Sequence, residues 1–312
     1  MRTNLLSILF IMLVSSLAAQ NTVDLKLNLE KNKTYRFKSA SEQTISQTIN
    51  GIQQNTDVNS SSTVSIKMVD ALPELMIVEF RFDTIMTRTN AMGVTSNYNS
   101  ANEGNITSAD MSDVLSCVLN RLSKNALYVK MDYAGKVIEI VNASMLSDII
   151  LKDTGAITGP QAQVIKTQIE GMAGNEALKS MVESFMNYLP ARQVATGDKW
   201  VITTALHAGG MSLDIVTSYV LTGLKEDAGI TAEANIKASE NAAPLEYGGA
   251  TIKYGELIGL SKFTMVVDAG TGLIIENKGK SHIAGNLDVT AQGYNLVIPM
   301  EINTTTGIVI LK

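Results

Sequence analysis

The chain has 312 residues, of which 45% are hydrophobic and 18% charged, and its formal net charge is −5. This length can bury a large core, in one β domain or in two small ones. The acidic balance argues against nucleic acid or anionic lipid headgroups as partners. Cys117 is the only cysteine, so no intrachain disulfide can form and stability has to come from core area.

Residues 1–20 are predicted to be a secretory signal peptide. Arg2 supplies the positive charge, residues 5–14 an apolar core, and residues 16–20 a cleavage region of small side chains. No later apolar run reaches the roughly 18 residues of a membrane helix. We therefore expect an exported protein, periplasmic or extracellular, that is soluble after cleavage. A lipid anchor is not expected, because no cysteine follows the cleavage region.

The first strand-rich half, residues 21–143, shows the two-residue alternation of half-buried strands. Asn50-Gly51 has the composition of a tight hairpin turn. The Asn-rich stretch at residues 88–106 is either a strand continuation or a loop. The strands expected here are residues 25–29, 34–49, 64–68, 76–82, 127–131 and 137–141.

One helix is expected at residues 109–123, and three more in a helical middle at residues 144–190. Each start is predicted from a capping side chain. The expected helices and their caps are 109–123 with Ser108, 145–152 with Ser144, 160–172 with Thr158 and Gln161, and 175–189 with Asn175. Pro190 prevents continuation of the last helix.

The helix at 175–189 carries an apolar stripe at the helical period. Its members are Leu178, Met181, Val182, Phe185, Met186 and Leu189. Burial of these side chains does not offset the ordering of the backbone unless the helix packs on another surface, and strands are the large surface available. The methionine-rich stripe is interpreted as core packing, with an adaptable lining for an apolar ligand as the alternative.

The second strand-rich half, residues 191–312, is predicted to hold most of the remaining sheet. Gly209-Gly210 is a hairpin signal, and Gly255 and Gly259 weaken the long strand at 251–267. The small side chains of Ala232 and Ala234 suggest that something bulky, such as the helical middle, packs on that face. The expected strands are residues 200–206, 211–221, 230–238, 251–267, 273–282, 287–292, 294–303 and 307–311.

Two similar hairpins hint at a duplicated β unit. Residues 131–138 and 267–274 both carry an aspartate at the turn and a glycine before the second strand. Asp and Gly are also what any turn of this kind favours. Asp132 and Asp268 are therefore interpreted as turn formers rather than as a catalytic carboxylate pair.

The chemistry that the sequence lacks is informative. His207 and His282 are the only histidines, a poor basis for a two-histidine metal site. Cys117 is expected to be a buried structural thiol, since no activating motif surrounds it. Neither a nucleophile elbow, a phosphate-binding glycine loop nor a zinc-protease motif occurs. We assign no catalytic, cofactor-binding or metal-binding residue and expect no cofactor.

Three stretches carry a resemblance. Residues 27–37, residues 127–137 and the segment from Pro190 to Gly197-Asp198-Lys199-Trp200 resemble a functionally uncharacterised family of exported, β-rich bacterial proteins. Such a family has no catalytic residues to carry over. By fold-level analogy, the pattern also resembles envelope lipid-carrier half-barrels, in which helices lie in the concave side of a curved antiparallel sheet.

We therefore predict one α+β domain over residues 21–312, with a curved, mostly antiparallel sheet and the central helices packed on one face. The leading functional hypothesis is a non-enzymatic envelope protein that holds a lipid or other apolar ligand between sheet and helices. The alternative is a structural or adhesive component that recognises an envelope protein or polysaccharide through the polar tracts at 55–63 and 90–106. A hydrolase using Asp or Glu is the third hypothesis.

Overall fold

A computed structural model describes residues 22–158, 162–208, 211–240, 242, 244–247, 249–291 and 293–311. The predicted signal peptide at residues 1–20, the predicted capping residue Gln161 and the predicted Gly209-Gly210 turn lie outside these ranges. Ala208 and Met211, which flank that turn, pair with each other.

Most strands belong to one 14-stranded antiparallel sheet, and a two-stranded sheet pairs β1 (Thr22–Leu25) with β8 (Arg192–Ala195). The large sheet has the order β7-β6-β4-β3-β2-β16-β15-β14-β11-β10-β9, with β5 on β4, and with β13 pairing β12 and β15. Its strands are β2 (Thr34–Ile49), β3 (Ile52–Ala71), β4 (Leu75–Ala91), β5 (Val94–Asn99), β6 (Leu127–Asp132), β7 (Val137–Ile140), β9 (Lys199–Ala208), β10 (Met211–Leu224), β11 (Asp227–Ala238), β12 (Leu245–Tyr247), β13 (Ala250–Tyr254), β14 (Ile258–Asp268), β15 (Ile274–Ala291) and β16 (Tyr294–Leu311).

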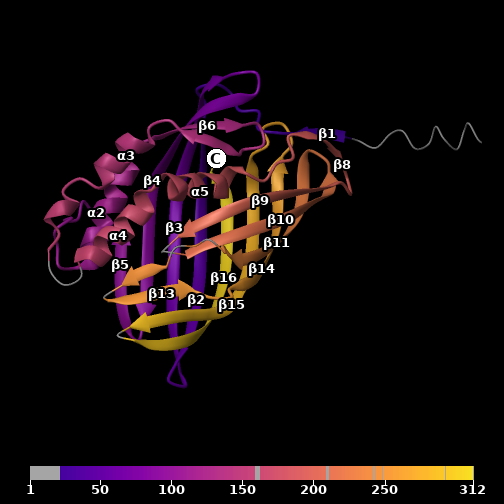
Figure 1. Ribbon diagram of the computed structural model, residues 1–312. Helices are drawn as coiled ribbons and strands as arrows, with labels where there is room; N and C mark the ends of the chain where they lie inside the picture. The colour runs from indigo at the N-terminus through magenta and orange to yellow at the C-terminus, as the bar shows by residue number, and fades with distance from the viewer. Residues whose placement is uncertain are drawn as a thin grey trace, which may run out of the picture.

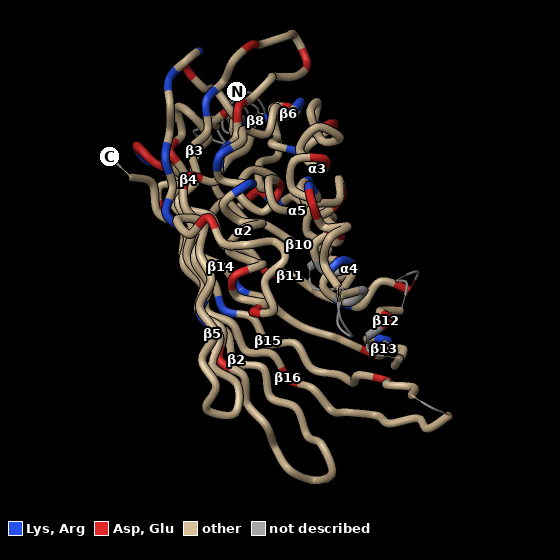
Figure 2. The backbone as a smooth tube through the Cα atoms, turned by 90° about the vertical axis from the view of Figure 1, so that its left-hand side faces the viewer, with Lys and Arg blue, Asp and Glu red and all other residues tan. Residues whose placement is uncertain are grey.

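The sheet is curved, and the helices lie on its concave side (Figures 1 and 2). These helices are α2 (Met111–Lys124), α3 (Ala143–Ile150), the 3₁₀ turn η1 (Thr154–Ala156), α4 (Ala162–Ala173) and α5 (Asn175–Met186). The two halves of the chain join where β2 pairs with β16, for example Ile45 with Ile302. The predicted α+β class and the central position of the helices are confirmed.

The predicted hairpin at Asn50-Gly51 is confirmed. Both residues have positive φ, 52° and 77°, as a two-residue type I′ turn requires. The predicted strand at residues 25–29 is wrong beyond Leu25. Leu27 and Leu29 are nevertheless buried, because the backbone of this segment is hydrogen-bonded to two turns instead of to a strand. Leu27 N–H donates to the Tyr133 carbonyl at 2.8 Å, and Asn28 N–H donates to the Thr271 carbonyl at 2.9 Å.

Both aspartates at those turns act as predicted. Asp132 Oδ1 accepts from the backbone N–H groups of Ala134 and Lys136, each at 2.9 Å. Asp268 Oδ1 accepts from Gly270 N–H at 3.0 Å and Thr271 N–H at 2.6 Å. Each carboxylate is therefore used to hold its own turn.

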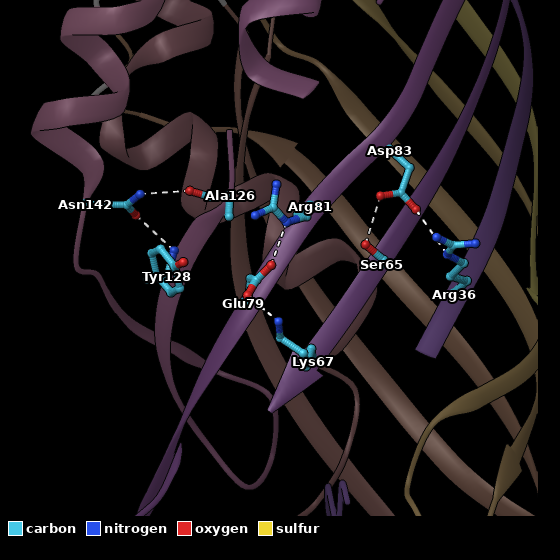
Figure 3. A network of polar contacts seen from close by, with 9 residues as sticks. All are labelled: Arg36, Ser65, Lys67, Glu79, Arg81, Asp83, Ala126, Tyr128 and Asn142. Atoms are coloured by element: carbon cyan, nitrogen blue, oxygen red, sulfur yellow. Dashed lines mark hydrogen bonds and ion pairs between the residues drawn. The ribbon is translucent and has the colours of Figure 1, made fainter. Parts of the chain in front are cut away.

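The predicted starts of helices α2 and α3 are wrong. Helix α2 begins after Asp110, whose carboxylate accepts from Ser112 N–H at 2.9 Å, while Ser108 accepts from Asp110 N–H at 3.1 Å. Helix α3 begins after Asn142 instead of Ser144. The Asn142 side chain does not cap the helix. It accepts from Tyr128 N–H at 2.9 Å and donates to the Ala126 carbonyl at 2.8 Å (Figure 3), so it ties the helix start to β6.

Asn175 is the first residue of α5 and not its cap. Gly174 occupies the N-cap position in an extended conformation, and its carbonyl accepts from Leu178 N–H at 3.0 Å. The helix ends at Met186, before the predicted end at residue 189. The predicted stripe is buried at Leu178, Val182, Met186 and Leu189.

The strand pattern of the second half differs from the prediction in two ways. The strand expected at residues 251–267 is split into β13 and β14 by an irregularity at residues 255–257, which lie opposite the two residues 285–286 of β15. The Gly255 N–H still donates to the Asn286 carbonyl at 2.8 Å. The four strands expected from residue 273 onward merge into two, β15 and β16. β15 is long enough to pair with both β13 and β14.

Burial follows the strand alternation on β2 to β4. Val64, Ile66, Phe80 and Phe82 face the helices and are buried, and the Phe80 ring lies 6.0 Å from that of Phe185 in α5. The opposite face of these strands carries a polar network (Figure 3). In it Glu79 pairs with Lys67 at 2.7 Å and Arg81 at 2.6 Å, and Ser65 donates to Asp83 at 2.9 Å, which in turn pairs with Arg36 at 3.6 Å.

Candidate ligand cavities between sheet and helices

The first cavity, here called the serine cavity, lies between β2 to β5 and the helical layer. Its volume is about 300 Å³. The register places Ser39 opposite Ser62 and Ser41 opposite Ser60, so these four hydroxyls share the concave face. The helical side chains that the structure describes in its lining are all apolar: Val118, Leu119, Leu122, Ile150, Met172 and Met181.

The second cavity, here called the α5 cavity, adjoins the first at Ser39, which lines both. Its volume is about 400 Å³, and it lies between α5 and strands β9, β10, β11, β14, β15 and β16. Apolar side chains dominate its lining: Phe185, Leu206, Ile215, Tyr219, Ala234, Ile236, Phe263, Met265, Ile274 and Ile308. Ala234 was expected to face a bulky element, and it instead lines space beneath α5.

A buried aromatic group borders the α5 cavity, which Tyr188 and Tyr219 help to line. Tyr188 Oη donates to the Gly272 carbonyl at 2.6 Å, and the Tyr188 carbonyl accepts from Trp200 Nε1 at 3.0 Å. Trp200 stacks on Tyr219 with ring centroids 5.5 Å apart. Burial raises the pKa of the Tyr188 hydroxyl, and it raises the pKa of Tyr219 to about 12. Trp200 is therefore a core anchor, and the two tyrosine hydroxyls stay neutral at physiological pH.

A third cavity of about 260 Å³, here called the polar mouth, borders the α5 cavity between α5 and β9. Ser180, Glu183, Asn187, Thr204 and Ala205 line both spaces. The charged or titratable residues of the mouth are Lys136, Glu176, Lys179, Glu183, His207 and Asp214. Of these, only Glu183 also lines the α5 cavity, so charge is concentrated at one border of an apolar space.

Glu183 predicts a pH dependence of stability. Burial raises the pKa of its carboxyl above the ordinary 4.5, although Val137 N–H donates to it at 3.0 Å. A folded-state pKa above the unfolded value means that folding loses stability as the pH rises from about 4.5 through the raised pKa. Glu183→Gln keeps an acceptor for Val137 and removes the charge. We expect it to be more stable than the parent at pH 7, by less than about 1 kcal/mol because the group is half exposed to solvent.

Urea denaturation at pH 4 and pH 7 measures this effect. The advantage of Glu183→Gln should shrink at the lower pH, where both states of the parent carry a protonated carboxyl. Glu176→Gln, on the exposed side of the same helix, is the control, and an equal pH-dependent gain there would contradict the assignment to Glu183.

The remaining residues singled out from the sequence do not form a site. Cys117 is a free thiol with 7% exposure, as predicted. His207 and His282 lie on β9 and β15, which three strands separate, so roughly 19 Å of sheet lies between them. No cluster of three or more metal-ligating side chains occurs within the described part of the chain.

Sequence reasoning missed the lining of these cavities. The tract at residues 55–63 was expected to be an exposed contact surface, but Ser60 and Ser62 face inward. The two-residue alternation along this strand could have predicted the inward direction, since Ser60 and Ser62 are in step with the buried Val64 and Ile66. The cavities themselves had no sequence signal, because they depend on how far α5 stands from the sheet.

A model of a family of unknown function (DUF6263) matches residues 73–274. The chain belongs to this family. The match includes β4, the helices α2 to α5 and the roofs of both cavities, and it confirms the resemblance to an uncharacterised β-rich family. No curated protein matches the chain.

Three solved structures resemble the chain at low identity. A structure of lipid–protein interactions in lipovitellin has a TM-score of 0.49 and 8% identity, and covers 91% of this chain but 26% of that one. An outer membrane channel from Pseudomonas putida F1 has a TM-score of 0.23 and 9% identity, covering 92% and 98%. A putative outer membrane lipoprotein-sorting protein domain from Vibrio parahaemolyticus has a TM-score of 0.14 and 8% identity, covering 86% and 83%.

These likenesses carry no argument about function, since every TM-score is below 0.5. The chain spans about a quarter of lipovitellin. Among the described helices, none combines the length and hydropathy needed to cross a membrane.

Proposed function

We propose that this family member is a non-enzymatic envelope protein that holds an apolar ligand between its helices and its sheet. The observation that carries the proposal is the pair of adjoining cavities, about 300 and 400 Å³, beneath a roof of Leu, Val, Ile, Met and Phe side chains. Ligand cavities are typically 300–1,000 Å³ and mostly apolar, with a few placed polar groups. A two-part space with one serine-lined wall fits an apolar chain or ring system.

Methionines support the same proposal. Met172 and Met181 line the serine cavity and Met265 the α5 cavity. Their unbranched side chains adapt to ligands of different shape better than Leu or Ile. The core-packing interpretation of the stripe accounts for Leu178, Val182 and Met186, whereas Met181 and Phe185 border open space.

The adhesive alternative is less well supported. Part of its polar tracts faces inward, since Ser60, Ser62 and Tyr98 line the serine cavity, whereas most of residues 90–105 are exposed as expected. A hydrolase is also disfavoured, because Asp132 and Asp268 hold their own turns and the carboxylates of the polar mouth lie beside two lysines.

Native mass spectrometry of the protein purified from its own host tests the proposal, with an apolar molecule of lipid mass as the expected adduct. Uptake of N-phenyl-1-naphthylamine gives a quantitative measure. Ala234→Leu adds bulk inside the α5 cavity and should lower uptake severalfold, whereas Ala40→Leu adds the same bulk to an exposed position on β2 and should not. Absence of any adduct together with equal uptake by both variants would contradict ligand binding in this cavity.

A further inference from the structure

One buried polar atom beside the α5 cavity lacks a hydrogen-bond partner. Within the described part of the chain, Asn277 Oδ1 is the buried side-chain nitrogen or oxygen atom left without a hydrogen bond. Asn277 lies on β15 between Met265 of β14 and Ile308 of β16, and all three line the α5 cavity. An unpaired acceptor in such an apolar setting destabilises the protein and calls for an explanation.

We infer that the ligand of the α5 cavity is a neutral apolar molecule with a hydroxyl group, which bonds to the amide of Asn277. This inference rests on the proposed function. A hydroxyl both donates and accepts, so it pairs with whichever amide atom faces the open space. A rotation of the buried amide brings Oδ1 to that hydroxyl. Fatty alcohols, acylglycerols and sterol-like alcohols have this chemistry. A fatty acid does not fit, because the lining residues that the structure describes include no Lys or Arg, and the charged one among them is Glu183.

Competition against N-phenyl-1-naphthylamine by dodecan-1-ol, tridecane and dodecanoate tests the inference. We expect dodecan-1-ol to compete better than dodecanoate. In Asn277→Leu, the affinity ratio of dodecan-1-ol to tridecane should fall about tenfold, the equivalent of one hydrogen bond. Asn235→Leu, at an exposed position on β11, is the matched control. Asn277→Ser keeps a hydrogen-bonding group and should retain most of the preference.

An unchanged ratio in Asn277→Leu, or stronger binding of dodecanoate than of dodecan-1-ol, would overturn the hydroxyl inference while leaving apolar ligand binding intact. Failure of all three compounds to compete would overturn the proposed function as well.

The tips of β2–β3, β4–β5 and β15–β16 lie at the same end of the sheet, away from the helices (Figures 1 and 2). They carry exposed apolar side chains: Ile52 at 66%, Met92 at 76%, Val94 at 69% and Tyr294 at 78%. Residues 43–56, 89–102 and 289–300 contain no Asp, Glu, Lys or Arg, although 18% of the chain is charged.

The turn at Met92-Gly93 strengthens this observation. Its φ angles, 50° and 81°, nearly repeat the 52° and 77° of Asn50-Gly51. Asparagine is favoured at the first position of such a turn, and a methionine there is strained. The exposed Met92 therefore occupies this tip although its positive φ disfavours a methionine.

We propose that these three tips insert into the surface of an uncharged lipid bilayer. The lack of charge matches a neutral lipid surface and offers no attraction to anionic headgroups. A stable protein interface needs roughly 20–30 residues on each side, more than the few apolar side chains on separate hairpin ends supply. A bilayer needs only that those side chains enter its apolar layer.

Flotation with phosphatidylcholine vesicles tests this proposal. The full-length mature protein should float with the vesicles, and 0.5 M salt should leave its binding unchanged. The triple variant Ile52→Asn, Met92→Asn and Tyr294→Asn should lose about tenfold or more in partition. The control triple Ile138→Asn, Val141→Asn and Val201→Asn removes exposed apolar side chains elsewhere and should bind normally. Equal loss in both triples, or a salt-stable dimer that ignores vesicles, would overturn bilayer insertion.

Discussion

Phe80→Ala is expected to lower the free energy of unfolding by about 3–5 kcal/mol. Phe80 is fully buried on β4, and its ring packs edge-on against two others. Its ring centroid lies 5.2 Å from that of Phe82 and 6.0 Å from that of Phe185 in α5. It therefore joins the sheet to the helix that roofs the α5 cavity. Removing the ring leaves a void beside a space that is already open, which the surrounding strands are too constrained to close.

Urea denaturation followed through Trp200 fluorescence measures this change. Tyr294→Ala removes a ring of similar size that is 78% exposed, and should shift stability by less than about 0.5 kcal/mol. If Phe80→Ala cost no more than Tyr294→Ala, the helical layer would not be held by this contact. Packing of Phe80 against Phe185 would then not be what holds α5 above the sheet.

Gly272→Ala is expected to cost about 3 kcal/mol or more, from two separate effects. Gly272 has a φ of +74°, and a Cβ there would lie 2.3 Å from the backbone carbonyl oxygen of Lys26. The N-terminal segment would have to move away, which breaks the bond from Asn28 N–H to the Thr271 carbonyl. The same movement disturbs the carbonyl of Gly272, which accepts from Tyr188.

Gly51→Ala separates the two effects. Gly51 has a φ of +77° with nothing within 4 Å of the added Cβ, so its variant reports backbone strain alone, about 1–2 kcal/mol. The difference between the two variants measures the contact with the N-terminal segment. Equal losses would show that this segment yields freely and does not fasten the turn at residues 268–272.

Local patterns predicted the strands best where one face is apolar and the turn chemistry is strong. β2 was predicted at its observed limits, residues 34–49, because its alternation ends at an Asn-Gly pair. The Asp132 and Asp268 turns were predicted for the same reason. Helix starts were predicted less well. Ser108, Ser144 and Asn175 each have a side chain that can cap a helix, but a residue one or two positions away occupies the N-cap.

The sequence by itself determined the strand-rich halves, the helical middle, the tight turns and the absence of a disulfide framework, since each depends on residues close together in the chain. Only the tertiary structure decided that β2 lies beside β16, that Ser39 pairs with Ser62 across neighbouring strands, and that Asn277 borders an open space. These features depend on the register and curvature of a long sheet and on the height of α5 above it. Contacts between distant segments set those quantities, and no local pattern encodes them.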